Sequence, residues 1–205
     1  MERKSSDDNA TPPRRPTGAA IKRPAVTEAL GRVFFEEWAA HGYAGLSLER
    51  VAKRAGAGKA ALYRRWPDKA AMASDLLSRT GLTLTDVPPQ ASLVDDVRAL
   101  LFALRRVLRH RQIRLIVADV HAELERTPAL GQAIRPFQRA RRMRVDGLID
   151  RAIARGELSA TADRETIADL LAAPLYWRMV VTGGRADRRH IDRLATALAA
   201  AIKAC

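Results

Sequence analysis

The sequence has few of the residues that several kinds of protein need. It contains a single cysteine, Cys205, in 205 residues, so no disulfide can form within the chain and no zinc site can be built from several cysteines. No apolar run approaches the roughly 20 residues of a membrane-spanning helix, and residues 1–27 hold no continuous apolar segment of signal-peptide length. Aromatic residues make up only 5% of the chain. We therefore expect a soluble, cytoplasmic protein with a largely aliphatic core.

Acidic residues are scarce relative to basic ones. Lys and Arg number 36 against 23 Asp and Glu, which gives a formal net charge of +13 and a pI near 11.0. Such an excess of positive charge favours a polyanionic partner. The apolar fraction of 47% is that of a globular protein, and the length is ample to bury a core.

Apolar residues recur at three- and four-residue steps along most of the chain, and no segment alternates as a β-strand does. This pattern predicts an all-α fold of about nine helices. Leu130 to Ile134 is expected to form a short turn before Pro136, which can begin the following helix. The expected helices span residues 24–41, 48–55, 59–66, 68–80, 93–108, 113–124, 136–155, 164–182 and 188–203.

Three segments organise the chain. Residues 1–22 are rich in charge and proline without a hydrophobic period, so we expect a disordered basic arm. Residues 23–69 carry the first three helices, and residues 70–205 carry the remaining ones. A linker-like break with two prolines is expected at 81–91.

The segment from Leu48 to Lys69 meets the requirements of a helix-turn-helix. Ala52 is small where the two helices must touch, and Gly56 can take the positive φ of the turn. If Leu62 and Trp66 point inward, the helical rotation places Ala60 and Arg64 on the opposite face. Lys59 and Arg65 lie on or beside this helix and Lys69 begins the next one, so all three add positive charge to this part of the chain. The Tyr63 hydroxyl can reach a phosphate.

Residues 46–72, LSLERVAKRAGAGKAALYRRWPDKAAM, resemble the DNA-binding signature of the TetR family of bacterial transcriptional regulators. The resemblance implies that Ser47, Tyr63 and Lys69 hold DNA phosphates. It implies that Lys59, Ala60 and Arg64, on the third helix, read bases. The family often has threonine and histidine where this chain has Ala61 and Arg65.

The second half is similar to TetR-type regulatory domains through ARGEL at 154–158 and DLLAAPLYWRMVVTGG at 169–184. This resemblance implies a helical ligand chamber and a dimer formed by the last two helices. Because the core needs only aliphatic side chains, the aromatic ones suggest a small apolar or aromatic ligand; the candidates are Phe102, His121, Phe137, Tyr176 and Trp177. The apolar stripes of the last two helices suggest the dimer contacts Leu170, Trp177, Leu194 and Leu198.

Other patterns are weaker. Asp119, His121 and Glu123 diverge around a helix, so we expect no metal site, and no motif indicates catalysis or a cofactor. The arginines between 135 and 144 could bind an acidic ligand or DNA, although such a series is usually a solvated helix face. Two other functions stay open: a helical small-molecule or lipid-binding protein with a basic surface, and a nonspecific DNA binder, which would need no large apolar second half.

Overall fold

The computed structural model describes residues 24–84 and 86–205, with the backbone alone at 81–84. The expected basic arm at 1–22 lies outside these ranges. The described residues form nine α-helices and one π-helical turn, without a strand, so the all-α prediction is confirmed. The elements are α1 Pro24–Gly45, α2 Leu48–Arg54, α3 Lys59–Tyr63, α4 Lys69–Leu84, α5 Leu93–Leu108, α6 Arg111–Glu123, α7 Pro128–Ala154, α8 Arg164–Tyr176, η1 Trp177–Val181 and α9 Arg188–Ile202.

Most helix boundaries follow from capping residues in the sequence. Asp163 and Asp187 cap α8 and α9 as expected, because their carboxylates accept hydrogen bonds from backbone N–H groups of the first turn. Ser47 and Ser92 cap α2 and α5 in the same way. Gly42 interrupts the helical backbone of α1 with a φ of 68°, where the sequence predicts that the first helix stops.

The prediction for Pro136 is wrong. It lies inside α7, a single helix that begins at Pro128 directly after Thr127. Proline at the first helical position costs no hydrogen bond, whereas an interior proline removes one. Leu130 and Ile134, on the turns before Pro136, are both buried, and this packing holds the helix together across the lost bond.

Two further boundaries differ from expectation. Helix α4 continues to Leu84, beyond Gly81, where the linker was expected to begin. The penultimate helix contains Pro174, and from Trp177 to Val181 its backbone widens into the π-helical turn η1. Because proline has no N–H, the regular ladder of α-helical hydrogen bonds is broken near this point.

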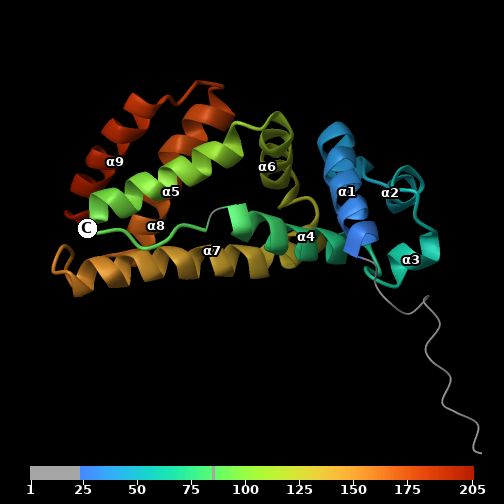
Figure 1. The fold of residues 1–205 in the computed structure, drawn as a ribbon, viewed down its shortest axis with the longest axis horizontal. Helices are drawn as coiled ribbons and strands as arrows, with labels where there is room; N and C mark the ends of the chain where they lie inside the picture. The colour runs from blue at the N-terminus through green and yellow to red at the C-terminus, as the bar shows by residue number, and fades with distance from the viewer. Residues whose placement is uncertain (1–23, 85) are drawn as a thin grey trace, which may run out of the picture.

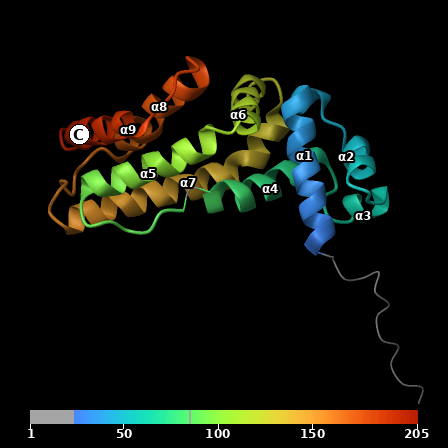
Figure 2. The ribbon, with the colours of Figure 1, turned by 45° about the horizontal axis from the view of Figure 1, so that its top comes forward.

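The helices form an elongated molecule (Figures 1 and 2). Helices α1, α2 and α3 lie at one end, and α8 and α9 lie with α5 toward the other. Helix α7 runs along the length of the molecule and packs extensively on α4. None of the described helices combines the length and the apolar character needed to cross a membrane.

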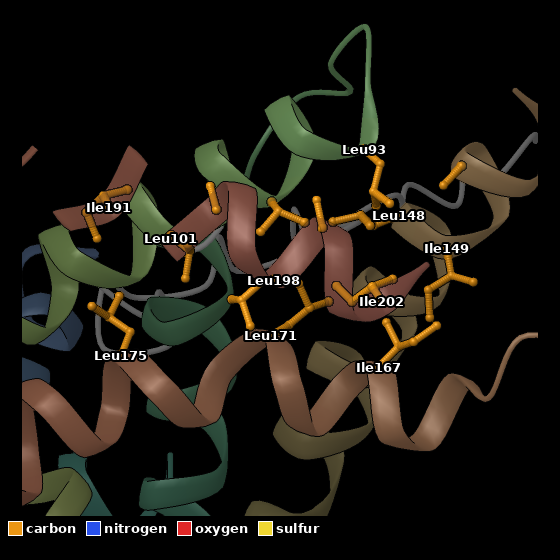
Figure 3. Packing of buried hydrophobic residues seen from close by; sticks show 14 of the residues in the cluster. Leu93, Leu101, Leu148, Ile149, Ile167, Leu171, Leu175, Ile191, Leu198 and Ile202 are labelled. Carbon is orange, nitrogen blue, oxygen red and sulfur yellow. The ribbon is translucent and has the colours of Figure 1, made fainter. Parts of the chain in front are cut away.

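The buried side chains form two clusters. One lies among α5, α8, α9 and the end of α7, and it includes Leu101, Leu171 and Leu198 (Figure 3). The other lies among α1 to α4 and is completed by Ile116 of α6 and by Leu130 and Ile134 of α7. The core beneath the predicted DNA-binding end is therefore shared with helices from the second half of the chain.

Asp119 of α6 joins the two halves through hydrogen bonds. Its Oδ2 atom accepts bonds from the Trp38 indole Nε1 at 2.6 Å and from the Tyr43 backbone nitrogen at 2.8 Å. A Cβ atom on Gly42 would lie 2.9 Å from Asp119 Oδ1. Glycine at 42 thus supplies both the left-handed backbone and the space for this carboxylate.

Glu37 fixes α2 against α1. Its side chain is 3% exposed, and its carboxylate accepts 2.8 Å hydrogen bonds from Arg50 Nε and Arg54 Nη1, whose side chains are about half exposed. Burial raises the pKa of Glu37, but the hydrogen bonds and charges of Arg50 and Arg54 outweigh it, so the pKa lies below its ordinary value.

We expect Glu37→Gln to lower the free energy of unfolding by about 1–2 kcal/mol at pH 7, because two charge-assisted hydrogen bonds weaken next to half-exposed arginines. Since the folded pKa is lowered, the wild-type advantage should be complete above the ordinary carboxyl pKa of 4.5 and disappear as the pH falls through the folded value. Urea unfolding at several pH values measures this. Glu28→Gln, an exposed change on the same helix, is the control; an equal loss in both variants would contradict the prediction.

Candidate nucleic-acid interface

The turn between α2 and α3 is built as the sequence predicts. Gly56 has a φ of 64°, and the Ala57 nitrogen donates a 2.9 Å hydrogen bond to the Ala52 carbonyl, which closes the turn. A Cβ atom on Gly56 would meet nothing within 4 Å. Its backbone conformation, rather than crowding, therefore favours glycine here.

Helix α3 presents one face to the core and the other to solvent. Leu62 is fully buried and Trp66 is 4% exposed, with its Nε1 atom donating to Asp75 Oδ2 at 2.9 Å. Lys59, Ala60 and Arg64 are exposed. The regular helix ends at Tyr63 rather than at 66. The rotational prediction for Ala60 and Arg64 agrees with their exposure, and Lys59 is exposed as well; the contact of these residues with bases stays a prediction.

The two hydroxyl groups expected to hold phosphates both donate to one carboxylate. The Tyr63 hydroxyl donates to Glu49 Oε1 at 2.7 Å, and the Ser47 hydroxyl donates to Glu49 Oε2 at 3.1 Å. The Tyr63–Glu49 bond is the largest cause that raises the pKa of Tyr63 and the largest that lowers the pKa of Glu49, and the bond from Ser47 lowers the pKa of Glu49 further. The structure thus brings Ser47 and Tyr63 together around an anion that belongs to the protein itself.

Lys69 opens α4, as expected, but its ammonium group turns toward α1. The Nζ atom lies 2.8 Å from the carbonyl oxygen of Tyr43 and 3.3 Å from that of Ala44. It also lies 4.5 Å above the Tyr43 ring. An ammonium group has three N–H donors. Lys69 uses two of them to hold the end of α1, and its contact with a phosphate stays a prediction.

Known proteins match the chain over both halves. Residues 35–76 match the family described as "Bacterial regulatory proteins, tetR family", and residues 87–198 match "Tetracyclin repressor-like, C-terminal domain". The chain belongs to the TetR family. The remaining comparisons agree with this assignment.

Two curated relatives are about 30% identical to this TetR-family regulator over three quarters of its chain. The uncharacterised HTH-type transcriptional regulator YdeS of Bacillus subtilis is 30% identical over 154 residues, which are 75% of this chain and 77% of YdeS. A DNA-binding transcriptional repressor of Mycobacteroides abscessus, called TetR, is 32% identical over 163 residues, covering 75% and 80% of the two chains. Salmonella enterica GusR has the same fold, with a TM-score of 0.72 at 21% identity over 91% of this chain and 99% of GusR.

The family and the exposed helix-turn-helix make this chain a DNA-binding transcriptional regulator. The basic small-molecule or lipid-binding protein is not favoured, because the match includes the whole of the helix-turn-helix. Regulators of this family bind operator DNA and dimerise through a ligand-binding domain.

The structure does not gather the five residues predicted to bind the ligand. Phe102 packs against the second-half core, and the Tyr176 hydroxyl lies 2.9 Å from His121 Nδ1. Phe137 lies beneath the Arg141 guanidinium at 5.7 Å, and Trp177 is 61% exposed. A cavity of about 600 Å³ lies instead among α5, α7 and α8, and none of the five residues lines it.

The four residues predicted to form dimer contacts differ in their exposure. Leu198 is 5% exposed and Leu194 is partly buried, because the apolar stripe of α9 packs on the core with α5. Leu170 also packs against this core. Only Trp177 is strongly exposed. Leu198 is buried within its own protomer and offers little surface to a partner, so its dimer contact stays a prediction.

Sequence reasoning missed Glu49, Glu37 and Asp119 as partners of the site. Glu37 had a detectable signal, since an acidic residue at 37 falls on the same helical stripe as Leu30, Phe34 and Trp38. Glu49 had none, because an exposed glutamate in a first turn is common. Asp119 was considered only as a metal ligand; among the described residues no group of three His, Cys, Asp or Glu side chains could hold a metal ion.

We expect Glu49→Gln to strengthen DNA binding about threefold to tenfold, because the variant removes a negative charge from the place where a phosphate would approach Ser47 and Tyr63. Fluorescence anisotropy with labelled operator DNA measures the affinity. Glu165→Gln, which removes the same charge from an exposed position at the start of α8, is the matched control. Equal gains in both variants would show only a net-charge effect.

Proposed function

We propose that this regulator is a homodimeric repressor that binds a palindromic operator and is released from it by a small molecule. The proposed DNA binding is supported by the arrangement of α3 and the residues after it. Leu62 and Trp66 are buried and hold this segment against the core, while Lys59, Ala60 and Arg64 are exposed. Ser47 and Tyr63 flank this face at a spacing that the Glu49 carboxylate already bridges. The protein would act in the cytoplasm, where bacterial operators lie.

The assigned roles divide the contacts into two classes. Ser47, Tyr63 and the remaining donor of Lys69 would position the protein on phosphates, which carry no sequence information. Lys59, Ala60 and Arg64 would meet base edges in the major groove. An arginine that binds the O6 and N7 atoms of guanine is the commonest specific contact of this type.

Arg64→Ala should weaken binding to the operator by about 1–3 kcal/mol and relax the preference at one base pair per half-site. Tyr63→Phe should instead weaken binding to operator and random DNA alike, because only a phosphate contact is lost. The operator is first obtained by selecting duplexes from a random pool with the purified protein. Equal losses on operator and random DNA would remove Arg64 from base reading, and failure to enrich any sequence would contradict the proposed function.

The outer faces of α8 and α9 support the dimer part of the proposal. Ala173, Trp177 and Val181 are exposed at four-residue steps along α8 and η1, and α9 exposes Ala197 and Ala200. These two helices pack against each other. Two copies that joined these faces would cover large apolar side chains that otherwise meet water, and small alanines allow close approach of helices.

Trp177→Asp should therefore convert the dimer to a monomer and weaken operator binding by at least about tenfold, since one protomer holds one half-site. Analytical ultracentrifugation and anisotropy measure the two effects. Met143→Asp is the matched control, because Met143 is a 72% exposed apolar residue on α7. Aspartate at the buried Leu198 would unfold the protomer and so would not test the interface. A Trp177→Asp variant that sediments as an unchanged dimer would refute this face.

A further inference from the structure

The cavity among α5, α7 and α8 has two kinds of wall. Leu100 and Leu104 of α5 and Leu171 of α8 contribute apolar side chains, and Val145 and Leu148 of α7 add two more among the arginines of that helix. The remaining wall carries five arginines, Arg139, Arg141, Arg142, Arg144 and Arg151, against the two carboxylates of Asp86 and Asp96. A volume of about 600 Å³ is that of a site for a drug-sized molecule.

The carboxylates are already engaged by cations. Asp96 is 1% exposed, and it is bonded to Arg151 at 3.3 Å and to Arg155 at 2.9 Å. Asp86 pairs with Arg144 at 3.6 Å. Arg142 pairs at 3.7 Å with Asp146, which does not line the cavity. The two carboxylates of the wall are therefore paired with two of its five arginines, Arg144 and Arg151, and with Arg155, while Arg142 is paired with a carboxylate outside the cavity.

Arg139 and Arg141 differ from the other arginines of the wall. Within residues 24–84 and 86–205, neither forms an ion pair with a carboxylate. Arg141 lies instead over the Phe137 ring. Its side chain is exposed but lies in the lining of the cavity. Neighbouring protein atoms replace part of the surrounding water there, and this lowers the pKa of the guanidinium. In addition, the Arg151 Nε atom is buried and has no hydrogen-bond partner in the part of the chain that the structure describes.

We propose that this cavity binds an organic anion, a molecule with a carboxylate or similar acidic group on an apolar body, and that Arg139 and Arg141 receive the acidic group. This inference rests on the ligand-controlled regulation proposed above and gives the ligand a chemical class. Two guanidinium groups without carboxylates offer the forked donors that an oxyanion accepts. The leucine side of the same cavity takes the apolar body.

This ligand class differs from the purely apolar or aromatic one that the sequence suggests. A neutral apolar molecule would leave two guanidinium groups at the wall without an anion. DNA does not fit the site either, because the leucine-lined side would remain uncovered by a sugar–phosphate backbone. The cavity also lies among α5, α7 and α8, whereas the base-reading helix α3 lies at the other end of the molecule (Figure 1).

The test uses the full chain and two matched pairs of probes, biphenyl-4-carboxylate with biphenyl-4-carboxamide and dodecanoate with dodecanamide. Each amide has nearly the shape of its acid but carries no charge. In isothermal titration calorimetry at pH 7, at least one carboxylate should bind about tenfold tighter than its amide, the advantage of a charge-assisted hydrogen bond over a neutral one. Equal affinities within both pairs, or the absence of carboxylate binding, would overturn the proposal.

The double variant Arg139→Gln/Arg141→Gln should lose the preference for the carboxylate and bind the amide as the wild type does. Arg135→Gln/Arg193→Gln removes the same charge from exposed positions that do not line the cavity, and it should keep the preference. Arg141→Lys alone keeps the charge without the fork, so the preference should decrease but persist. A preference unchanged in the double variant would overturn the assignment of these arginines.

Operator affinity is measured on the same samples without any probe. The double variant should bind the operator as the wild type does, because its substitutions lie far from α3. If operator binding is intact and no carboxylate preference exists, only the ligand class fails. If the preference exists and no operator can be selected, the proposed repressor function fails while the anion site stands.

Discussion

The three helices at the DNA-binding end are too small to bury a core of their own, and this constraint governs the whole structure. Domains this short bury a smaller fraction of their surface than larger ones. Here the deficit is met by α4, by Ile116 of α6, and by Leu130 and Ile134 of α7. The helix-turn-helix therefore rests on side chains from the second half. A shift in α6 or α7 would therefore change the packing beneath α1.

Charge at the DNA-binding end is arranged by a few acidic residues. Glu37 binds Arg50 and Arg54, whose side chains stay about half exposed, and these ion pairs attach α2 to α1. Glu49 holds the Ser47 and Tyr63 hydroxyls on the outside. The first carboxylate is nearly inaccessible to water, whereas the second is exposed and accepts hydrogen bonds from the two hydroxyls that we propose for phosphate contacts. The net charge of +13 alone does not reveal this division.

Local features of the sequence predicted most of the fold. The caps Ser47, Asp163 and Asp187, the positive φ of Gly56 and the inward pair Leu62 and Trp66 depend on neighbouring residues only. The prediction for Pro136 failed where distant contacts decide, because the residues beside it in the helix are buried. Distant contacts also place Leu198 in the protomer core, where α5 covers it. An amphipathic pattern shows that one face of a helix is buried. It does not show whether a helix of the same protomer or of a second copy covers that face.

The candidate site divides in the same way. The outward position of Ala60 and Arg64 follows from helical rotation, and the structure agrees with it. The aromatic residues of the second half gave a misleading guide to the cavity, because aromatic side chains pack in cores and stack on neighbours as readily as they bind ligands. Its arginine wall could be recognised only after three helices were placed around one space. Before that, a series of arginines on a long helix is typical of a solvated face.

The junction of Gly42 and Asp119 limits how such a chain can diverge. A Cβ atom at 42 would come within 2.9 Å of the carboxylate that holds Trp38 and the Tyr43 backbone. A side chain at 42 would therefore require the Asp119 carboxylate to move, and this movement would disturb both hydrogen bonds. These two positions, 77 residues apart in the chain, should therefore vary together among descendants of this sequence, as a pair that records the attachment of the DNA-binding end to the rest of the protein.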